Sequence, residues 1–208
     1  MPKLTFFFDY ASPYAYLGAT QVAALADKHH APLTWHPFLL GGLFRAIGTP
    51  LVPLFEMSAA KRAYQGVDIQ RWADHYQVAY TFPSRFPMNT VKPLRMALQL
   101  DSVDRPRLVL PLFRAYWADD RDISDAQVLR AIADEAGFDG AALLAGCADP
   151  SVKSRLHETT EQARAAGVCG APSFLVQSDD EDDGMLFWGQ DRLGLIDKAL
   201  AGWRPACG

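Results

Sequence analysis

The sequence predicts an α/β fold, with strands near both ends of the chain and helices in the middle. Short apolar, aromatic-rich segments, typical of buried strands, occur near each end. The long region between them shows apolar residues at helical spacing instead. Of the 208 residues, 50% are hydrophobic and 21% are charged, so the chain can bury a sizeable core.

The first strand leads directly into a helix. Residues 3–8 read Lys-Leu-Thr-Phe-Phe-Phe, and Ser12-Pro13 follows a short polar segment. Serine is favoured at the N-cap of a helix and proline at its first position, so we expect a helix from Pro13 to about Lys28. A second strand at residues 32–38 completes a β-α-β unit.

The middle of the chain is predicted to be helical. Glycine and proline at Gly41-Gly42 and at Gly48-Thr49-Pro50 indicate loops, and 83–93 reads as another loop. Helices are predicted over the following ranges: 59–76, 91–101, 105–117, 124–136, 139–145 and 150–166.

The C-terminal part returns to strands. Residues 171–177 and 185–188 are predicted to pair as a hairpin around the acidic turn 178–184, and a helix is expected over 191–201. The acidic turn lacks the ligand spacing of a calcium loop, so we interpret it as a solvated turn.

This order of elements is that of a thioredoxin-like fold with an inserted all-helical domain. A β-α-β half comes first, a helical block follows, and helix-β-β-helix closes the chain. We expect the thioredoxin-like domain to comprise residues 1–40 and 160–208, and the inserted helical domain residues 41–159.

Composition argues against several classes of partner. The formal net charge is −4, from 20 Lys and Arg against 24 Asp and Glu, without a basic run. Nucleic acid and anionic membrane surfaces are therefore not expected partners. Apolar stretches fall short of the ~20 residues that cross a bilayer, and the first residues lack a signal-peptide pattern. We expect a cytoplasmic protein.

Neither the cysteines nor the histidines form a recognisable site. Cys147, Cys169 and Cys207 are far apart, without a C-x-x-C or metal-binding cluster, so we interpret them as buried or idle thiols. The five histidines show no ligand pattern, and no metal is expected.

Ser12 occupies the position that carries redox chemistry in thioredoxin-type folds. There the first helix begins with a C-x-x-C pair, and the helix N-terminus stabilises a thiolate. This chain has Ser12-Pro13-Tyr14-Ala15 instead, so dithiol–disulfide exchange is excluded at that position. A serine hydroxyl can still donate a hydrogen bond to the thiolate of a bound thiol, worth ~1.5–3 kcal/mol. The simpler interpretation is an ordinary helix cap, and the two roles are compatible.

Ala171-Pro172 opens the third predicted strand. A proline at this place can follow a cis bond, which would leave the backbone of Ala171 free to pair with an extended peptide ligand. A trans bond at an ordinary strand start is the alternative.

Two other segments have both a structural and a binding interpretation. Trp188-Gly189-Gln190-Asp191 either caps the last helix or holds the ammonium and carboxylate of an amino acid. Lys61, Tyr64 and Asp68 share one helix face, which is by default a solvated face.

Several segments resemble the 2-hydroxychromene-2-carboxylate isomerase family, the bacterial branch of the kappa-class glutathione transferases within the DsbA-like thioredoxin superfamily. The resemblance covers essentially the whole chain. It is strongest in Phe6-Phe7-Phe8-Asp9-Tyr10-Ala11-Ser12-Pro13-Tyr14-Ala15-Tyr16-Leu17, Leu40-Gly41-Gly42-Leu43-Phe44-Arg45, the segment 61–72 that begins Lys61-Arg62-Ala63-Tyr64, Gly170-Ala171-Pro172-Ser173-Phe174 and Trp188-Gly189-Gln190-Asp191-Arg192-Leu193.

The resemblance implies glutathione as cofactor and assigns a role to each matching residue. Ser12 would hydrogen-bond and activate the glutathione sulfur. Ala171, before a cis Pro172, would pair with the cysteinyl part. The γ-glutamyl end would be held by Gln190 and Asp191, beside the Trp188-Gly189 backbone, and the glycine carboxylate by Lys61. Thr49 stands where the family commonly has Asn. At a substrate or cofactor contact, its hydroxyl can replace only part of the hydrogen bonding of an amide. The family also implies a homodimer.

The implied activity is the isomerisation of 2-hydroxychromene-2-carboxylate to trans-o-hydroxybenzylidenepyruvate in naphthalene-type aromatic catabolism. A thiolate would add to the conjugated carbon, the former double bond would rotate, and elimination would return the thiol. Phe44, Phe86 and Trp188 are candidates to wall the small aromatic carboxylate substrate, and Arg85 or Asn89 to meet its carboxylate. The alternatives are a kappa-class glutathione transferase acting on electrophiles, a thiol–disulfide oxidoreductase and a non-catalytic binding module.

Overall fold

The computed structural model describes residues 2–178 and 184–206. Most of the predicted acidic turn and Cys207 lie outside these ranges. The elements are β1 Lys3–Phe8, α1 Pro13–Lys28, β2 Leu33–Pro37, α2 Leu40–Ile47, the 3-10 helix η1 Pro53–Glu56, α3 Ala59–Tyr76, α4 Val91–Leu98, α5 Asp104–Trp117, α6 Ala126–Glu135, α7 Gly140–Gly146, α8 Pro150–Ala165, β3 Ser173–Gln177, β4 Met185–Trp188, the 3-10 helix η2 Gln190–Arg192 and α9 Leu193–Leu200.

One four-stranded sheet forms the centre of the molecule, with the strand order β2-β1-β3-β4. β1 pairs in parallel with β2 and antiparallel with β3, and β3 pairs antiparallel with β4. Phe6 and Phe8 of β1 and Phe174 of β3 are fully buried, which explains the aromatic-rich strand sequences. Because β1 is parallel to β2, the connection between them crosses one face of the sheet as α1.

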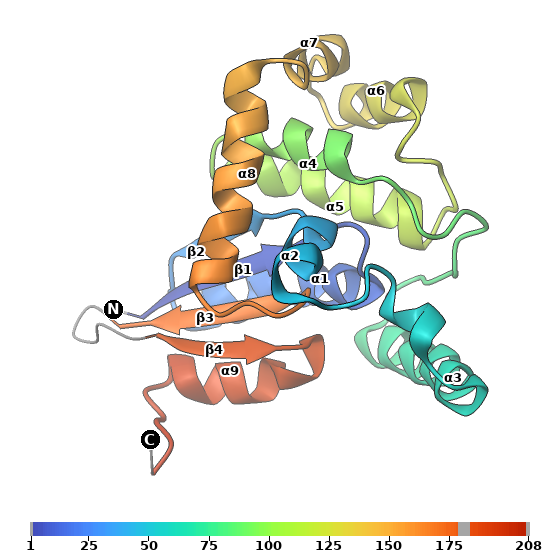
Figure 1. Cartoon of the computed structure of the whole chain (residues 1–208). Helices are drawn as coiled ribbons and strands as arrows, with labels where there is room; N and C mark the ends of the chain where they lie inside the picture. Colours follow the sequence, from blue (N-terminus) through green and yellow to red (C-terminus); the bar gives the residue numbers. More distant parts are fainter. Residues whose placement is uncertain (1, 179–183, 207–208) are drawn as a thin grey trace.

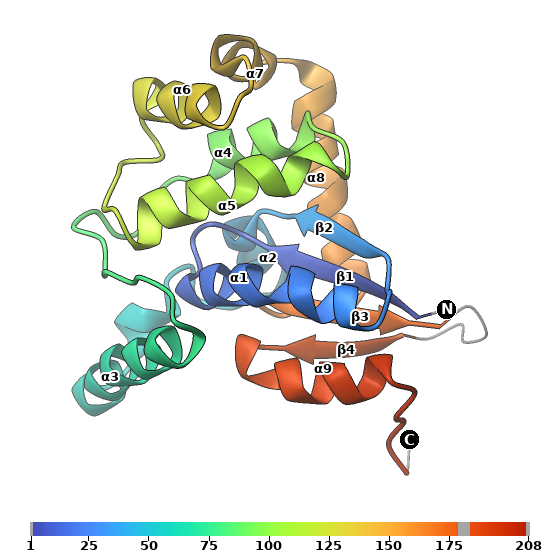
Figure 2. The same cartoon turned by 180° about the vertical axis from the view of Figure 1, so that it is seen from behind.

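Helices cover both faces of the sheet. α8 runs in front of the sheet and α1 behind it in Figure 1, and the reverse view in Figure 2 exchanges them. α9 contacts both α1 and β3, whereas α8 contacts β2, α2 and α4. α4, α5, α6 and α7 stack beyond the β2 edge, and α3 projects to one side (Figures 1 and 2). The arrangement confirms the predicted thioredoxin-like fold with added helices.

The loop predicted at Gly41-Gly42 was wrong, because both glycines lie in α2. Leu39, the N-cap of this helix, has no capping side chain. Residues far away in the sequence do the capping instead: Asp9 accepts a hydrogen bond from the Leu40 N–H at 2.8 Å, and Thr160 accepts one from the Leu39 N–H at 3.0 Å. Tertiary contacts thus outweigh the low helix propensity of glycine.

Elsewhere the predicted elements agree with the structure to within a few residues, although η1 was not predicted. The expected domain boundaries fall inside helices, at residues 40/41 in α2 and 159/160 in α8. α8 packs on β2 of the sheet as well as on α4 of the helical block, so this one helix joins the two parts.

Candidate functional site

Ser12 lies at the N-terminus of α1, just beyond the carboxyl end of β1. It is the N-cap residue, and its Oγ accepts a hydrogen bond from the N–H of Ala15 at 3.2 Å. The backbone N–H of Tyr14, in the first turn, has no hydrogen-bond partner among the described residues. A free N–H group and the positive end of a 16-residue helix together favour an anion at this place.

Ala171 meets Ser12 from the neighbouring strand. β1 and β3 are antiparallel, with Phe7 opposite Ser173, so the residues before β3 lie beside those after β1. The Ser12 hydroxyl donates a 2.7 Å hydrogen bond to the Ala171 carbonyl oxygen. The Ala171–Pro172 bond is cis, as one of the two interpretations of the sequence expected.

Gly189 continues the site along β4. Its N–H donates to the Pro172 carbonyl oxygen at 3.0 Å, which fixes the start of η2 beside the cis proline. Its φ of 104° lies in the left-handed region, and an added Cβ would collide with the Asp191 carboxylate, so glycine is required here. The indole of Trp188, 59% exposed, lies against Gly170.

Gln190 and Asp191 face α1 and α3. Gln190 is buried, with 3% of its surface exposed, and its carbonyl oxygen accepts a 3.1 Å hydrogen bond from the Tyr76 hydroxyl of α3. Burial, with the negative charge of Asp191 added, raises the pKa of Tyr76 to about 12. Burial also raises the pKa of Tyr14, and Asp68, Asp191 and Tyr64 add to this shift. Asp68 and Asp191 therefore both lie close enough to the Tyr14 phenol to act on it electrostatically.

Part of the α3 face that carries Lys61, Tyr64 and Asp68 lies near Tyr14 of α1. Tyr64 and Asp68 both influence the pKa of Tyr14, and the Tyr64 hydroxyl donates a weak 3.4 Å hydrogen bond to Asp68. Lys61 lies in the first turn of α3, on the same face of the helix and exposed. The sequence interpretation of this face was a solvated one, and in the structure Lys61 and Tyr64 are indeed exposed.

Asp9 supports the segment before Ser12 from inside the molecule. Its carboxylate accepts hydrogen bonds from the N–H groups of Ala11 at 3.0 Å and Leu40 at 2.8 Å, and it also bonds to the Thr90 side chain. Burial raises the pKa of Asp9 more than these hydrogen bonds lower it. One buried group thus joins the Ser12 segment to the starts of α2 and α4.

The structure brings Phe44 and Thr49 to one open cavity. It has a volume of about 480 Å³ and is lined by Phe44, Arg45, Gly48, Thr49, Pro50 and Leu51. Phe44 is buried on α2, and its carbonyl oxygen accepts the Thr49 N–H at 2.9 Å. This mainly apolar wall suits a flat ligand.

Phe86 is connected to the segment before Ser12 through one residue, Trp117. Its ring centroid is 6.3 Å from that of Trp117, and the Trp117 indole donates a 2.8 Å hydrogen bond to the Tyr10 carbonyl oxygen. Phe55 meets the Phe86 ring edge to face at 6.2 Å. Phe86 is therefore part of an aromatic cluster that reaches within two residues of Ser12.

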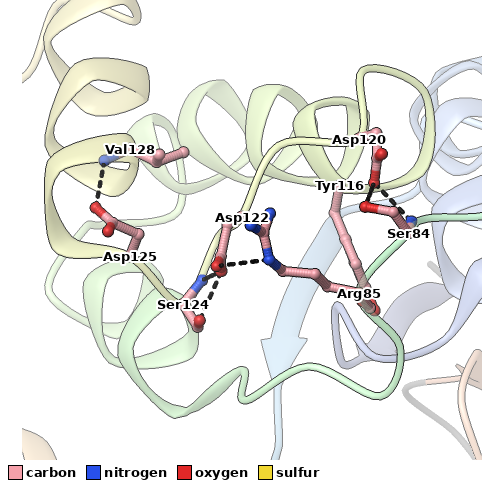
Figure 3. Close-up of polar contacts among 8 residues, drawn as sticks. All are labelled: Ser84, Arg85, Tyr116, Asp120, Asp122, Ser124, Asp125 and Val128. Atoms are coloured by element: carbon pink, nitrogen blue, oxygen red, sulfur yellow. Dashed lines mark hydrogen bonds and ion pairs between the residues drawn. The ribbon is translucent and has the colours of Figure 1, made fainter.

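Arg85 and Asn89 are occupied by contacts of their own. The Arg85 guanidinium lies 3.7 Å from the Asp122 carboxylate, and the Tyr116 hydroxyl donates to the Arg85 carbonyl oxygen at 3.1 Å (Figure 3). The Asn89 side chain accepts the Val91 N–H at 3.0 Å. Both side chains remain exposed, so their existing contacts compete with any ligand.

No group of His, Cys, Asp and Glu in residues 2–178 and 184–206 is arranged to hold a metal ion. Within the same ranges no helix is both long and apolar enough to span a membrane. Cys147 is buried and Cys169 is exposed, three residues before Pro172.

Sequence reasoning missed three residues of this region: Asp9, Tyr76 and Trp117. Each acts through a bond to the backbone of a distant residue, and such a bond leaves no local pattern. The available signals were indirect. An acidic residue directly after a buried strand is a candidate for a buried anchor, and Tyr and Trp with buried rings usually find a partner for their polar atoms.

Comparison with known proteins places the chain among relatives of similar length. It is 27% identical over 204 residues to the 2-hydroxychromene-2-carboxylate isomerase of Sphingobium xenophagum, covering 95% of this chain and 97% of the relative. It is 28% identical over 202 residues to human glutathione S-transferase kappa 1, covering 91% and 87%. A solved structure of a 2-hydroxychromene-2-carboxylate isomerase superposes with a TM-score of 0.83 at 24% identity, covering 96% and 94%.

The family profile described as the DSBA-like thioredoxin domain matches residues 3–201, nearly the whole chain. The match includes both strand-forming ends and the helices between them. The protein therefore belongs to the family of DSBA-like thioredoxin domains.

Proposed function

We propose that the protein is a glutathione-dependent isomerase that converts 2-hydroxychromene-2-carboxylate to trans-o-hydroxybenzylidenepyruvate. The observation that carries the proposal is Ser12 itself: a hydroxyl at a helix N-terminus, 2.7 Å from the carbonyl of the residue before a cis proline, where redox relatives need a cysteine. The similarity to isomerases of this name supports the choice of substrate.

The residues around Ser12 suit a bound glutathione molecule. The N–H of Ala171 has no hydrogen-bond partner among the described residues, and its carbonyl has only the Ser12 hydroxyl, so both can pair with a cysteinyl backbone. Asp68 and Asp191 suit the ammonium group of the γ-glutamyl end. Lys61, exposed on the same α3 face as Asp68, suits the glycine carboxylate.

Glutathione would supply a thiolate nucleophile, which this chain lacks at its Ser12-Pro13-Tyr14-Ala15 segment. The role of the protein would be to keep the glutathione sulfur deprotonated and to orient the substrate. Ser12 donates its hydroxyl proton toward the sulfur, and the N–H of Tyr14 and the α1 dipole add to the stabilisation. Phe44 and Phe86 would each offer an apolar surface to the aromatic ring of the substrate, and the Thr49 hydroxyl would bond to a substrate oxygen.

The test is incubation of the purified protein with 2-hydroxychromene-2-carboxylate, with and without glutathione, while the product spectrum is followed. Product formation that needs glutathione without consuming it supports the proposal. Turnover independent of glutathione, or none in its presence, overturns it.

A kappa-class glutathione transferase is the second candidate, favoured by the 28% identity to the human enzyme. That function consumes one glutathione for each electrophile conjugated, so the amount of glutathione left after the reaction separates the two. Reduction of insulin would instead indicate an oxidoreductase. Thermal stabilisation by glutathione without turnover would indicate a binding module.

A homodimer and a cytoplasmic location are further parts of the proposal. Light scattering from the purified protein tests the first, and cell fractionation tests the second.

A further inference from the structure

A second cavity, of about 410 Å³, lies between α2, α4 and α8. Four basic side chains line it, and Glu161 is the acidic residue in its wall. The glutathione site proposed above shares none of its residues with this cavity. The basic side chains are Arg45, Arg95, Lys153 and His157.

Within the described residues, few acidic groups face the basic side chains of this cavity. Glu161 is bound to Arg164, with a shortest N–O distance of 2.8 Å. Among residues 2–178 and 184–206, the side chains of Arg45, Lys153 and His157 form no ion pair and no hydrogen bond. In this part of the chain the three side chains therefore have no hydrogen-bond or ion-pair partner, although the Asp149 carboxylate, one turn before Lys153, interacts with it electrostatically.

Arg95 is the most buried of the four basic side chains. Its Nε is buried and has no hydrogen-bond partner. One terminal nitrogen donates a long 3.4 Å hydrogen bond to the Cys147 carbonyl oxygen, and the guanidinium makes no other hydrogen bond within the described residues. A guanidinium has five N–H donors, and a buried donor without a partner is unfavourable because it has lost its hydrogen bond to water. Groups of this kind in folded proteins usually have a water or ligand partner.

The four basic side chains come from three helices and line the same cavity. Lys153 and His157 are one turn apart on α8, which puts them on the same face, while Arg95 comes from α4 and Arg45 from α2. The planar forks of two arginines match the oxygens of phosphate and carboxylate groups. Apart from Glu161 and Thr160, whose hydroxyl donates to the Leu156 carbonyl oxygen, the remaining wall is formed by Leu39, Gly42, Ala46, Val91 and Leu156.

We propose that this cavity is a binding site for a small multivalent oxyanion, a compound with two or more phosphate or carboxylate groups. A single charge would leave most of the basic side chains unpaired, whereas a multivalent anion reaches several helices at once. The volume is in the range of small-molecule sites, about 300–1,000 Å³.

The test is calorimetric titration of the whole protein with diphosphate and with citrate at constant ionic strength, since salt screens exposed charges. The variant Arg45→Gln/Lys153→Gln removes two charges from the cavity by changing exposed side chains only. Arg130→Gln/Lys198→Gln removes two exposed charges elsewhere and gives the same net charge. Because Arg45 also lines the Phe44–Leu51 cavity, Lys153→Gln/His157→Gln serves as a second cavity variant.

We expect at least one of the two anions to bind with a Kd of about 1 mM or tighter, weakened about tenfold or more by either cavity variant and unchanged by the control. Tighter binding of diphosphate assigns a phosphate ligand, and tighter binding of citrate a carboxylate ligand. Equal weakening in cavity and control variants would mean general charge attraction and overturn the proposal. Failure of both anions to bind the unmodified protein would also overturn it.

Discussion

The Ser12 hydroxyl donates a 2.7 Å hydrogen bond to the Ala171 carbonyl oxygen, across 159 positions of sequence. A serine hydroxyl has a single proton to donate, so it cannot serve this carbonyl and a thiolate together. A peptide N–H paired with Ala171 would replace the serine proton and release it for the sulfur. The contact therefore links backbone recognition at Ala171 to thiolate stabilisation at Ser12.

Ser12→Ala should lower isomerase turnover about 10- to 100-fold, because the lost charge-assisted hydrogen bond is worth about 1.5–3 kcal/mol. The same loss should raise the pKa of bound glutathione by one to two units, which thiolate absorbance at about 240 nm reports. An unchanged pKa in the variant would exclude this role for Ser12.

The control for this variant is Asp149→Ala, which removes the N-cap of α8, a helix that also begins with proline. Both variants should lose about 1 kcal/mol in the free energy of unfolding through loss of a cap. Only Ser12→Ala should change turnover. A similar loss of turnover in both would mean that the effect is one of stability.

Gly170→Ala should weaken glutathione binding. A Cβ at this position would lie 2.5 Å from Nε1 of Trp188, so the exposed indole must move. We expect the KM for glutathione to rise about three- to tenfold with kcat nearly unchanged, since the change affects binding.

Gly66→Ala is the matched control, because an added Cβ there meets nothing within 4 Å. Gly66 is exposed in α3, so alanine should instead stabilise the protein by up to about 1 kcal/mol. Equal KM values in the two variants would show that Trp188 takes no part in binding.

Local signals predicted the Ser12 end of the site. Serine followed by proline identifies a helix start, and a proline at the head of a strand allows a cis bond, so both halves of the Ser12–Ala171 contact were expected separately. Their contact was not predicted, because it depends on the antiparallel pairing of β1 with β3.

The parts that sequence reasoning missed depend on long-range partners. α2 contains Gly41-Gly42 and gains its N-terminal hydrogen bonds from Asp9 and Thr160, which no local pattern reveals. The cis bond at Phe86–Pro87 was likewise not predicted. Conformational propensity is a property of the local sequence. These features depend instead on residues from elsewhere in the chain that pack against the segment.

Trp117→Phe should destabilise the fold by about 2–4 kcal/mol, because it leaves the buried Tyr10 carbonyl without its indole donor and opens a small cavity. Equilibrium unfolding in urea measures this change. Trp203→Phe is the control, since that side chain is 42% exposed near the C-terminus and should change stability by about 0.5 kcal/mol or less. Equal losses would mean that the Trp117–Tyr10 bond contributes nothing.

Tyr76→Phe should raise the KM for glutathione about fivefold, because the hydroxyl that holds the Gln190 carbonyl is worth ~1 kcal/mol. Tyr116→Phe removes a like hydrogen bond to the Arg85 carbonyl and should leave that KM unchanged. Equal KM values in the two variants would show that the bond to Gln190 does not position the glutathione site.

The Tyr76→Phe substitution should also change how the free energy of unfolding depends on pH. Burial and Asp191 raise the pKa of Tyr76 to about 12, above the value of about 10 in the unfolded chain. Between these two values the unfolded chain loses the Tyr76 proton first, so the stability that this group contributes below pH ~10 is lost as the pH rises. The phenylalanine variant lacks this loss. The difference in unfolding free energy between wild type and Tyr76→Phe should therefore shrink from pH ~10 to ~12, and a constant difference would show that Tyr76 is not shielded as the structure indicates.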